Sequence, residues 1–400
     1  MDLALEDVKV IDLTYGVAGP HCTKLMADYG ANVIKAESPR GGDLTRRVGP
    51  FPEDVPHQEK SGLFLHLNTN KKSITLDLET ASGVEVLKDL VSWADVLVEC
   101  YRPGYLESLG LGYSDLEKIN PSLVMTSITD FGQTGPYKDY KGSEIVAEAM
   151  GAIMYRHGQP DREPVKYHGH LGHFFAGNTA LVPTIGALIH SRLTGTGQHV
   201  DVSIQQALLG AVDRSLLRYP YTGEVGSRDR ASSGAMYPNG AFPCKDGFIS
   251  ILGGGTRRWP RVCRVMDRAD LITDPRFKTP EDRAEHVQEL DAIWRGWLLE
   301  NTMNDIFEKA MAIRLPVAPV YTTEDLVNNP HYRIRGFWVD IEHPVAGTFT
   351  FPGAPHKFSE SPWQIRTPAP LLGQHNEEVY CGLLGRSRQE LLTLRAQGAI

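Results

Sequence analysis

The sequence predicts an α/β protein in which a largely parallel β-sheet is covered by helices on both faces and a smaller α/β domain follows. Three observations predict it. The chain has 400 residues, 41% hydrophobic and 22% charged, so it has the apolar material for more than one folding unit. Short β-rich runs alternate with helical patterns through the first half. Near 220–243 the composition shifts to Gly, Ser, Pro, Tyr and Arg without a period, as at a domain connection.

The first half reads as successive βα units. The opening unit is a strand, a glycine turn at 16–20, a helix and a second strand. The predicted strands, all β-branched or apolar runs, are 8–13, 32–35, 73–78, 96–99 and 123–128. The predicted helices are 83–93, a long buried helix at 177–192, and 203–217 after a loop at 194–197. Strands that alternate with helices are typical of a parallel sheet.

The second half has fewer elements. A strand at 248–252, a glycine turn at 253–255 and amphipathic helices at 259–266 and 286–299 predict the smaller domain. The later β-rich runs, which predict a hairpin around the turn 344–347, are 336–342 and 348–351. We expect the large domain to comprise 1–220 and 331–400, and the small domain 221–330.

Charge and cysteine usage exclude several classes of protein. Lys and Arg number 41 against 49 Asp and Glu, a net charge of −8, whereas a nucleic-acid-binding protein needs a basic face. The five cysteines stand far apart without a CxxC pair, which argues against a disulfide framework and a zinc module. We therefore expect a cytoplasmic protein with no nucleic-acid partner.

No targeting or membrane segment is indicated. Acidic residues such as Glu6 stand where a signal peptide needs basic residues and an apolar run. The most apolar stretch, 171–189, is interrupted by His173 and Pro183. A membrane-spanning helix needs about 20 predominantly apolar residues, so this stretch is interpreted as a buried helix.

The turn Gly16–Gly19 is the first candidate site. A strand-to-helix turn presents backbone N–H groups and a helix N-terminus, which suit an anionic group such as phosphate. Glu37, at the end of the second strand, could hold a ribose hydroxyl in a dinucleotide site. The turn lacks the GxGxxG pattern, so a tight structural turn accounts for it equally well.

Cationic loops at strand boundaries are the second candidate. The segments 68–72 and 99–104 each carry Lys or Arg where ligands of α/β sheets usually bind. Taken singly, each fits a solvated basic edge. Together with Lys35, Arg46 and Arg47 they concentrate positive charge in an acidic protein, which indicates a polyanionic small ligand.

The segment Tyr167–His173 has three imidazoles spaced H-x-H-x-x-H. They could be metal ligands, histidines that contact a ligand at the entry to a helix, or a catalytic imidazole. Two glycines interrupt the segment and no fourth ligand accompanies it, so we expect no metal. The cysteines Cys22, Cys100 and Cys244 could be nucleophiles, but scattered cysteines are usually buried small hydrophobes.

An ordered series of motifs resembles family III CoA-transferases, the group with formyl-CoA, carnitine-CoA and benzylsuccinate CoA-transferases and the α-methylacyl-CoA racemases. The series extends from about residue 5 to 385. The segments that carry the resemblance are 12–14, 18–20, 25–37, 41–43, 70–73, 76–78, 94–96, 102–104, 120–121, 131–133, 135–136, 194–195, 197–198, 201–203, 274–277 and 372–375.

The resemblance implies a Rossmann-like large domain made from both ends of the chain, a smaller middle domain, and an interlocked, ring-like dimer. It implies coenzyme A or acyl-CoA as substrate and a carboxylic acid as its partner. The turn 253–255 resembles the mobile glycine loop of formyl-CoA transferase. The residues that match the family's CoA contacts are Val17, Ala18, Lys35, Arg46, Asn70, Lys72, Tyr101 and Arg102.

One position departs from the family pattern. Family transferases carry a catalytic aspartate in the pattern Asp-x-x-x-Gly, and its carboxylate takes the acyl group and then CoA. Here His173 stands at that position, followed by Phe174-Phe175-Ala176-Gly177. An imidazole cannot form the acid anhydride or the CoA thioester that this mechanism requires.

Four interpretations follow for His173, the candidate catalytic residue. We expect this chain to be the aspartate-deficient subunit of a heteromeric transferase that moves CoA from a donor such as succinyl-CoA to a carboxylic acid. Alternatively, His173 is a base for acyl-CoA hydrolysis, lyase chemistry or racemisation, although 142–146 lacks the racemase His-Asp-x-Asn motif. A nearby acid could replace the nucleophile, and the candidates are Glu144, Glu148, Asp161 and Glu163. The chain could also be a non-catalytic CoA-binding homologue.

Overall fold

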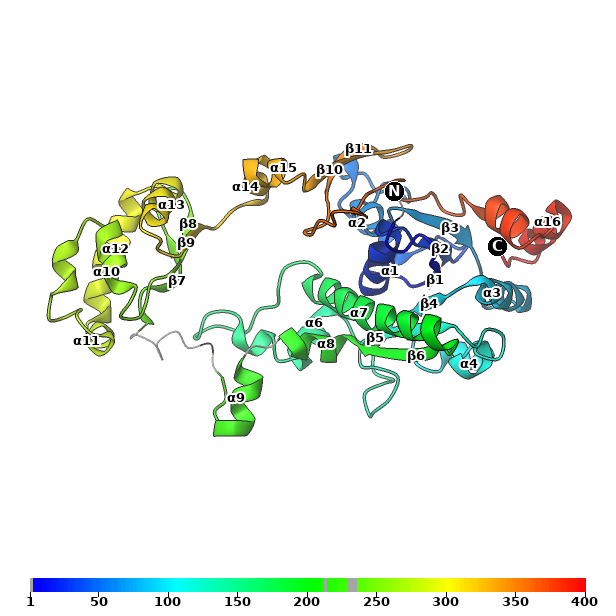
Figure 1. The fold of residues 1–400 in the computed structure, drawn as a ribbon, viewed down its shortest axis with the longest axis horizontal. Coiled ribbons are helices and arrows are strands. Elements are labelled where there is room, and N and C mark those ends of the chain that lie inside the picture. Colours follow the sequence, from blue (N-terminus) through cyan, green and yellow to red (C-terminus); the bar gives the residue numbers. More distant parts are fainter. Residues whose placement is uncertain (1–2, 212–213, 227, 229–235) are drawn as a thin grey trace. The chain divides into compact units, whose positions relative to one another are not determined.

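The structure of the chain is a computed structural model that describes residues 3–211, 214–226, 228 and 236–400 (Figure 1). The chain divides into two compact units. Unit 1 comprises Met1–Gly158, Glu163–Gly226 and Gly336–Ile400, and unit 2 comprises Gln159–Arg162 and Ser227–Arg335. Both ends of the chain therefore belong to unit 1. The domain limits expected from the sequence stay predictions.

Unit 1 is built on a six-stranded parallel sheet of order β3-β2-β1-β4-β5-β6. Its strands are β1 (Lys9–Leu13), β2 (Asn32–Glu37), β3 (Lys71–Thr75), β4 (Val96–Glu99), β5 (Val124–Thr129) and β6 (Gln198–Ser203). Every neighbouring pair is parallel. Successive strands are added on one side of β1 as far as β3 and on its other side from β4 onward. Ligands of such doubly wound sheets bind at the carboxyl ends of the strands at this switch point between β1 and β4.

Alternate side chains of the strands enter two separate cores, because successive residues of a strand point to opposite faces. Ile11, Ile34 and Leu97 belong to one core, and Val10 and Val98 belong to the other. The first core is closed by α3 (Ala81–Trp93) and α16 (Arg388–Ala396), and the second by α1 (Ala18–Asp28), α7 (Leu171–Thr194) and α8 (Ile204–Ala211). The sheet is thus covered on both faces, as the sequence predicts.

The carboxyl-terminal segment of the chain protects the edge strand β3. The backbone N–H of His375 donates to Ser73 O at 2.9 Å, and the Tyr380 hydroxyl donates to Thr75 O at 2.6 Å. The hairpin β10 (Trp338–His343) and β11 (Gly347–Pro352) precedes this segment. The remaining helices of unit 1 are α2 (Gly62–Leu67), α4 (Tyr105–Ser108), α5 (Tyr113–Leu116), α6 (Glu144–Met150) and α9 (Arg214–Thr222).

Unit 2 has a three-stranded antiparallel sheet and a helical layer around its own core. The buried side chains of this core include Trp294, Phe277 and Ile249. Its strands are β7 (Asn239–Pro243), β8 (Phe248–Leu252) and β9 (Val317–Pro319). Its helices are α10 (Trp259–Val265), α11 (Pro280–Glu285), α12 (Val287–Glu300), α13 (Met303–Ala312), α14 (Thr323–Asn328) and α15 (Pro330–Ile334).

Most predicted elements are confirmed, but several are corrected. Strand β7, for example, lies within 220–243, which the sequence analysis interprets as a domain connection. The strand β6 was not predicted, because its sequence QHVDVS is polar and its first half is exposed at the sheet edge. The predicted helix 203–217 is described as α8 and α9, and 212–213 lie outside the described residues. The prediction that 177–192 is a buried helix is wrong in two ways: α7 begins at Leu171, so His173 lies inside it, and one face of α7 is exposed.

The small residues of α7, rather than its large ones, face the sheet. The buried set includes Gly172, Ala176, Gly177, Ala180 and Ala187. In contrast, the exposed apolar set is Leu171, Phe175, Val182, Ile189 and Leu193, with 81% of Leu193 accessible. Within the described residues, no helix combines the length and the apolar character that crossing a membrane requires.

Gly177 sets how closely α7 approaches α1. A Cβ atom at Gly177 would lie 2.6 Å from Ala18 O and 3.1 Å from the His21 ring. A carbon atom does not pack this close to a carbonyl oxygen, so any other residue here must push the two helices apart. The first turn of α1 and the start of α7 therefore meet because residue 177 has no side chain.

We predict that Gly177→Ala destabilises unit 1 by about 1–3 kcal/mol, because the added methyl overpacks against backbone. The matched control is Gly296→Ala in α12, where an added Cβ meets no atom within 4 Å. That change should be neutral or stabilising by up to about 1 kcal/mol through helix propensity. Urea unfolding of both variants measures this, and equal effects would contradict the close approach of α1 and α7.

Candidate active site at the carboxyl edge of the sheet

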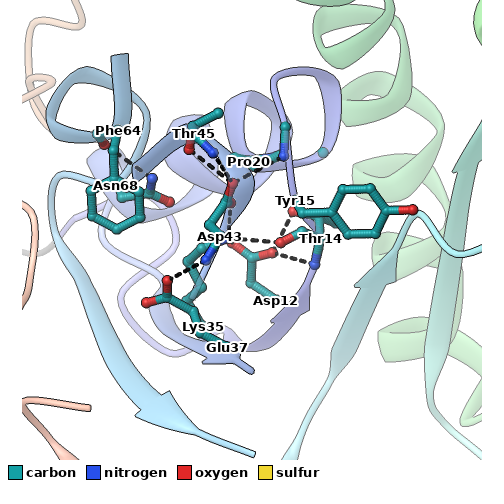
Figure 2. A network of polar contacts seen from close by, with 12 residues as sticks. Asp12, Thr14, Tyr15, Pro20, Lys35, Glu37, Asp43, Thr45, Phe64 and Asn68 are labelled. Atoms are coloured by element: carbon teal, nitrogen blue, oxygen red, sulfur yellow. Dashed lines mark hydrogen bonds and ion pairs between the residues drawn. The ribbon is translucent and has the colours of Figure 1, made fainter. Parts of the chain in front are cut away.

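A buried ion network underlies the carboxyl ends of β1 and β2 (Figure 2). The Asp12 carboxylate accepts from Lys71 Nζ at 2.9 Å and from Thr23 Oγ1 at 2.7 Å. Burial opposes ionisation of Asp12, but Lys35 and Lys71 outweigh it and hold its pKa well below the usual range. Burial also lowers the pKa of Lys71 to about 8. The network ties β1, β3 and α1 together with charges that no solvent reaches.

The network also fixes the turn after β1. The Lys35 ammonium lies 2.9 Å from Asp43 Oδ2 and donates to Thr14 O at 2.7 Å. Asp43 in turn accepts from the backbone N–H of Gly16 at 3.2 Å. Gly16 has φ 76°, a left-handed conformation that glycine adopts without strain. The loop that leads into α1 is therefore held by a buried ion pair.

Two of the predicted CoA contacts, Lys35 and Arg46, are components of this buried layer. Lys35 is 0% exposed. Arg46 is also 0% exposed and forms two hydrogen bonds to Glu37, at 2.7 and 2.8 Å, and one to Glu59 at 2.5 Å. Their charges are neutralised by carboxylates of the same chain. Glu37, the candidate ribose ligand, is occupied by Arg46.

Asn70 and Lys72 lie away from the switch point. Asn70 donates to Oδ1 of Asp28, the last residue of α1, at 2.7 Å and accepts from the backbone N–H groups of Arg366 and Thr367. Its amide is therefore used to join the carboxyl-terminal segment to β3. The Lys72 ammonium, on a partly exposed side chain, pairs with Glu378 at 2.9 Å.

The structure brings together the other four predicted CoA contacts. Val17 is the N-cap of α1 and Ala18 its first residue, and the first turn holds no acidic side chain. Tyr101 and Arg102 follow β4, the strand beside β1, and the Tyr101 ring lies 6.0 Å from the Tyr15 ring after β1. Within the described residues, the exposed Arg102 guanidinium has no ion-pair partner. An anion at this switch point meets a helix N-terminus and a free cation.

The last residue of β4, Glu99, has a buried carboxyl group. Glu99 is 3% exposed and accepts from the backbone N–H of Tyr101 at 2.6 Å. Burial raises its pKa to about 7, against the opposing hydrogen bonds from Ser127 and Tyr101. The neighbouring Cys100 thiol donates to Tyr15 O, and burial raises its pKa as well. Cys100 therefore stays a neutral thiol that joins the two loops.

His173 is held by a carboxylate at the start of α7. The Glu144 side chain, from α6, lies 2.9 Å from His173 Nδ1 and accepts from the backbone N–H groups of Gly172 at 2.6 Å and His173 at 3.2 Å. Burial opposes ionisation of Glu144, but these donors outweigh it and keep its pKa below the usual value. Glu144 thus caps a 24-residue helix and fixes the orientation of the imidazole.

Asp130 is a site residue that sequence reasoning missed. It directly follows β5, and burial raises its pKa, while His173 and the backbone N–H of Gly142 act in the opposite direction. Its charge also acts on Tyr15. The one signal in the sequence was its place directly after the predicted strand 123–128, where side chains of α/β sheets meet ligands.

The other candidate acids lie in different environments. Glu148 is 0% exposed and accepts from the backbone N–H of Tyr167 at 2.9 Å. Asp161 and Glu163 are exposed, and Asp161 belongs to unit 2. The thiols of Cys22 and Cys244 are buried, which raises their pKa values, so neither is an activated nucleophile.

One group of described residues, Glu144, His170 and His173, could hold a metal ion, since its ligand atoms lie within 4.8 Å of one another. Two features of the site disfavour a cation. The oxygens of Glu144 already accept three hydrogen bonds, and the positive end of α7 points at the group. The absence of a metal stays a prediction.

We predict that Glu99→Gln removes a pH dependence of stability. Folded Glu99 titrates near pH 7 instead of its ordinary 4.5, so the folded state holds this proton more tightly than the unfolded chain. Glu99 therefore contributes to the free energy of unfolding at low pH, and this contribution is lost as the pH rises from 4.5 to about 7. Urea midpoints at about pH 5 and about pH 8 should differ less in Glu99→Gln than in the parent chain. The exposed Glu117→Gln should keep the parent's slope, and an unchanged slope in Glu99→Gln would contradict the assignment.

Comparisons with known proteins identify the family to which the chain is similar. The family model described as CoA-transferase family III matches residues 5–376. The succinyl-CoA–D-citramalate CoA-transferase of Chloroflexus aurantiacus is 34% identical over 397 residues, which cover 99% of this chain and 98% of that protein. The succinyl-CoA–L-malate CoA-transferase beta subunit of the same organism is 33% identical over 407 residues, covering 100% and 98%.

Human and structural relatives extend the comparison. The succinyl-CoA:glutarate CoA-transferase of Homo sapiens is 31% identical over 396 residues, covering 99% of this chain and 90% of that protein. The crystal structure of a CaiB/BaiF family protein from Brucella suis matches with a TM-score of 0.86 and 30% identity, covering 96% of this chain and all of that one. The expected α/β fold and family are confirmed: the chain belongs to CoA-transferase family III.

Proposed function

We propose that unit 1 binds an acyl-CoA at the carboxyl edge of its sheet and that the chain takes part in transferring CoA from that donor to a carboxylic acid. The observation that carries the proposal is the convergence, at one edge of the sheet, of a helix N-terminus, the exposed Arg102 guanidinium and an imidazole held by a carboxylate. The first two suit the phosphates of CoA. The third, with Asp130 beside it, suits chemistry at an acyl group.

The CoA contacts divide into direct and supporting ones. Val17, Ala18, Tyr101 and Arg102 line the switch point and are proposed to touch the nucleotide. Lys35 and Arg46 are proposed to support CoA binding without touching CoA. Their buried ion pairs hold the loop after β1 and the segment 43–47 in place. Asn70 and Lys72, matched to CoA contacts by the resemblance, lie beside the other end of α1 and on β3.

The named relatives supply the substrate class. Three of them are named for succinyl-CoA and a small carboxylic acid: D-citramalate, L-malate and glutarate. We therefore propose succinyl-CoA as donor and a small carboxylic acid as acceptor. A cytoplasmic location stays part of the proposal, consistent with five free cysteines.

A second candidate role is the aspartate-deficient subunit of a heteromer. It is favoured by His173 at the position of the family's catalytic aspartate and by the relative that is named a beta subunit. In this role the acyl-CoA site is the same, and the attacking carboxylate comes from a paralogous chain. A purely non-catalytic CoA-binding role would share the same edge but show no turnover in any assembly.

The exposed apolar face of α7 supports association with a second chain. Val182 is 72% and Leu193 81% exposed, and both belong to the apolar set on one side of a 24-residue helix. Large exposed apolar patches mark protein–protein interaction sites. We propose that another family III chain, an identical copy or a paralogue, covers this face.

We predict that Arg102→Ala weakens CoA binding by about tenfold, since a charge-assisted hydrogen bond contributes about 1.5 kcal/mol or more. Isothermal titration calorimetry with CoA measures this. Arg395→Ala, an exposed arginine in the last turn of α16, should leave the affinity unchanged. No binding of CoA by the parent chain, or equal affinities of all three proteins, would overturn the proposed site.

We predict that Val182→Asp lowers the molar mass of the assembly, because a buried unpaired carboxylate opposes association. Light scattering after size exclusion should give a dimer for the parent chain and mostly monomer for the variant. Val55→Asp, at a 59% exposed valine outside α7, serves as control and should remain dimeric. A monomeric parent chain, or a dimeric Val182→Asp, would contradict association through α7.

A further inference from the structure

We propose that Asp130 supplies the attacking carboxylate of this chain, in place of the acid that is missing at position 173. The inference rests on the proposed function, since it names the group that would react with the acyl-CoA. It also makes this chain competent alone, without an acid from a partner. Its basis is the fixed position of Asp130 at the carboxyl edge and the state of every other acid around His173.

Two hydrogen bonds hold the backbone carbonyl group of Asp130. Asp130 O accepts from the backbone N–H of Gln205 at 3.0 Å and from Ser203 Oγ at 3.4 Å. These residues are the end of β6 and the start of α8. Asp130 therefore stands on two rigid elements rather than on a free loop, as precise placement of a reacting group requires.

The side chain of Asp130 is also fixed in direction. Gly142 packs directly against it, because a Cβ atom at Gly142 would lie 2.2 Å from Asp130 Cγ and 2.5 Å from Oδ2. The backbone N–H of Gly142 also lowers the pKa of Asp130, against the larger effect of burial. Two residues further, Glu144 reaches His173. A single short segment, 142–144, thus positions both Asp130 and the imidazole.

The other carboxylates near this site are buried or already accept hydrogen bonds. Glu144 accepts from three donors, and its pKa is lowered, which makes its carboxylate a weak nucleophile. Asp201 accepts from the backbone N–H of Gln133 through both oxygens at 3.0 Å. Glu99 and Glu148 are buried. Asp130, in contrast, is only partly buried, and its charge contributes to the raised pKa of Tyr15.

The chemistry balances without any further reactant. The Asp130 carboxylate attacks the thioester carbonyl, CoA leaves as a thiolate, and an acyl–aspartyl anhydride forms. The thiolate then attacks the aspartyl carbonyl, which releases the donor's carboxylate and leaves CoA as a thioester on Asp130. The acceptor carboxylate attacks that thioester, and the thiolate released returns to the acceptor's carbonyl. Acceptor acyl-CoA and free Asp130 result.

His173 is a positioning and electrostatic group in this scheme. Its Nδ1 is held by Glu144, and among the residues that the structure describes no hydrogen bond is formed by Nε2. Burial raises the pKa of Asp130 above its ordinary value, and His173 acts in the opposite direction, which favours the ionised carboxylate that must attack. Removing the imidazole should therefore slow the reaction less than removing the carboxylate does.

The test is isotope exchange by the purified chain alone: succinyl-CoA with labelled succinate, followed as label entering the thioester. We expect exchange by the parent chain and a loss of at least about 1,000-fold in Asp130→Asn, with CoA affinity and circular dichroism unchanged. Asp139→Asn, an exposed acid nine positions later in the sequence, is the matched control and should exchange normally. His173→Ala should lose less than Asp130→Asn.

A covalent trap gives a second readout. Hydroxylamine added during exchange should convert the peptide that contains Asp130 to its hydroxamate, as mass spectrometry detects. Exchange that persists in Asp130→Asn, or a hydroxamate on Glu144, would overturn the inference and leave the proposed function intact. A parent chain that binds CoA without exchange would also overturn it and assign the carboxylate to a partner. A chain that binds no CoA would instead overturn the proposed function.

Discussion

The buried charge of Asp12 is the interaction on which the rest of unit 1 depends. One carboxylate accepts from Lys71 and Thr23, and Lys35 lies within 4.0 Å, so three elements are tied to the first strand. Such a network is stable only while each charge has its partner, because an uncompensated buried charge is strongly destabilising. It continues through Asp43 to the turn before α1. The position of the helix N-terminus at the switch point is a consequence of that burial.

A second constraint aligns the reacting groups with this edge. Gly177 allows α7 to touch the first turn of α1, and Glu144 caps α7 from α6. Glu144 also orients the His173 ring, and Gly142, two residues earlier in the same segment, packs against the Asp130 side chain. Glu144 already accepts from three donors, whereas Asp130 is the carboxylate to which we assign the proposed chemistry.

The sequence predicted the parts of the fold with the strongest periodicity. The strands 96–99 and 248–252 were identified in full, because VLVE is a wholly buried apolar run and FISIL alternates exposed and buried residues, and both patterns are typical of strands. The edge strand β6 was missed because half of it faces solvent. The charges of Lys35 and Arg46 were visible, but their partners were not, since Asp43 and Glu37 become neighbours only when the sheet forms. Glu144 was named as a possible nucleophile, whereas its contact with the start of α7 needed the fold.

The most direct measurement of the central claim is a crystal structure of the chain with a non-hydrolysable thioether analogue of succinyl-CoA. The account predicts phosphates near the N-terminus of α1 and Arg102, and the carbon that corresponds to the thioester carbonyl within about 3.5 Å of the Asp130 carboxylate. An analogue bound with its acyl end away from Asp130 and His173 would contradict the account. So would phosphates bound away from the switch point between β1 and β4.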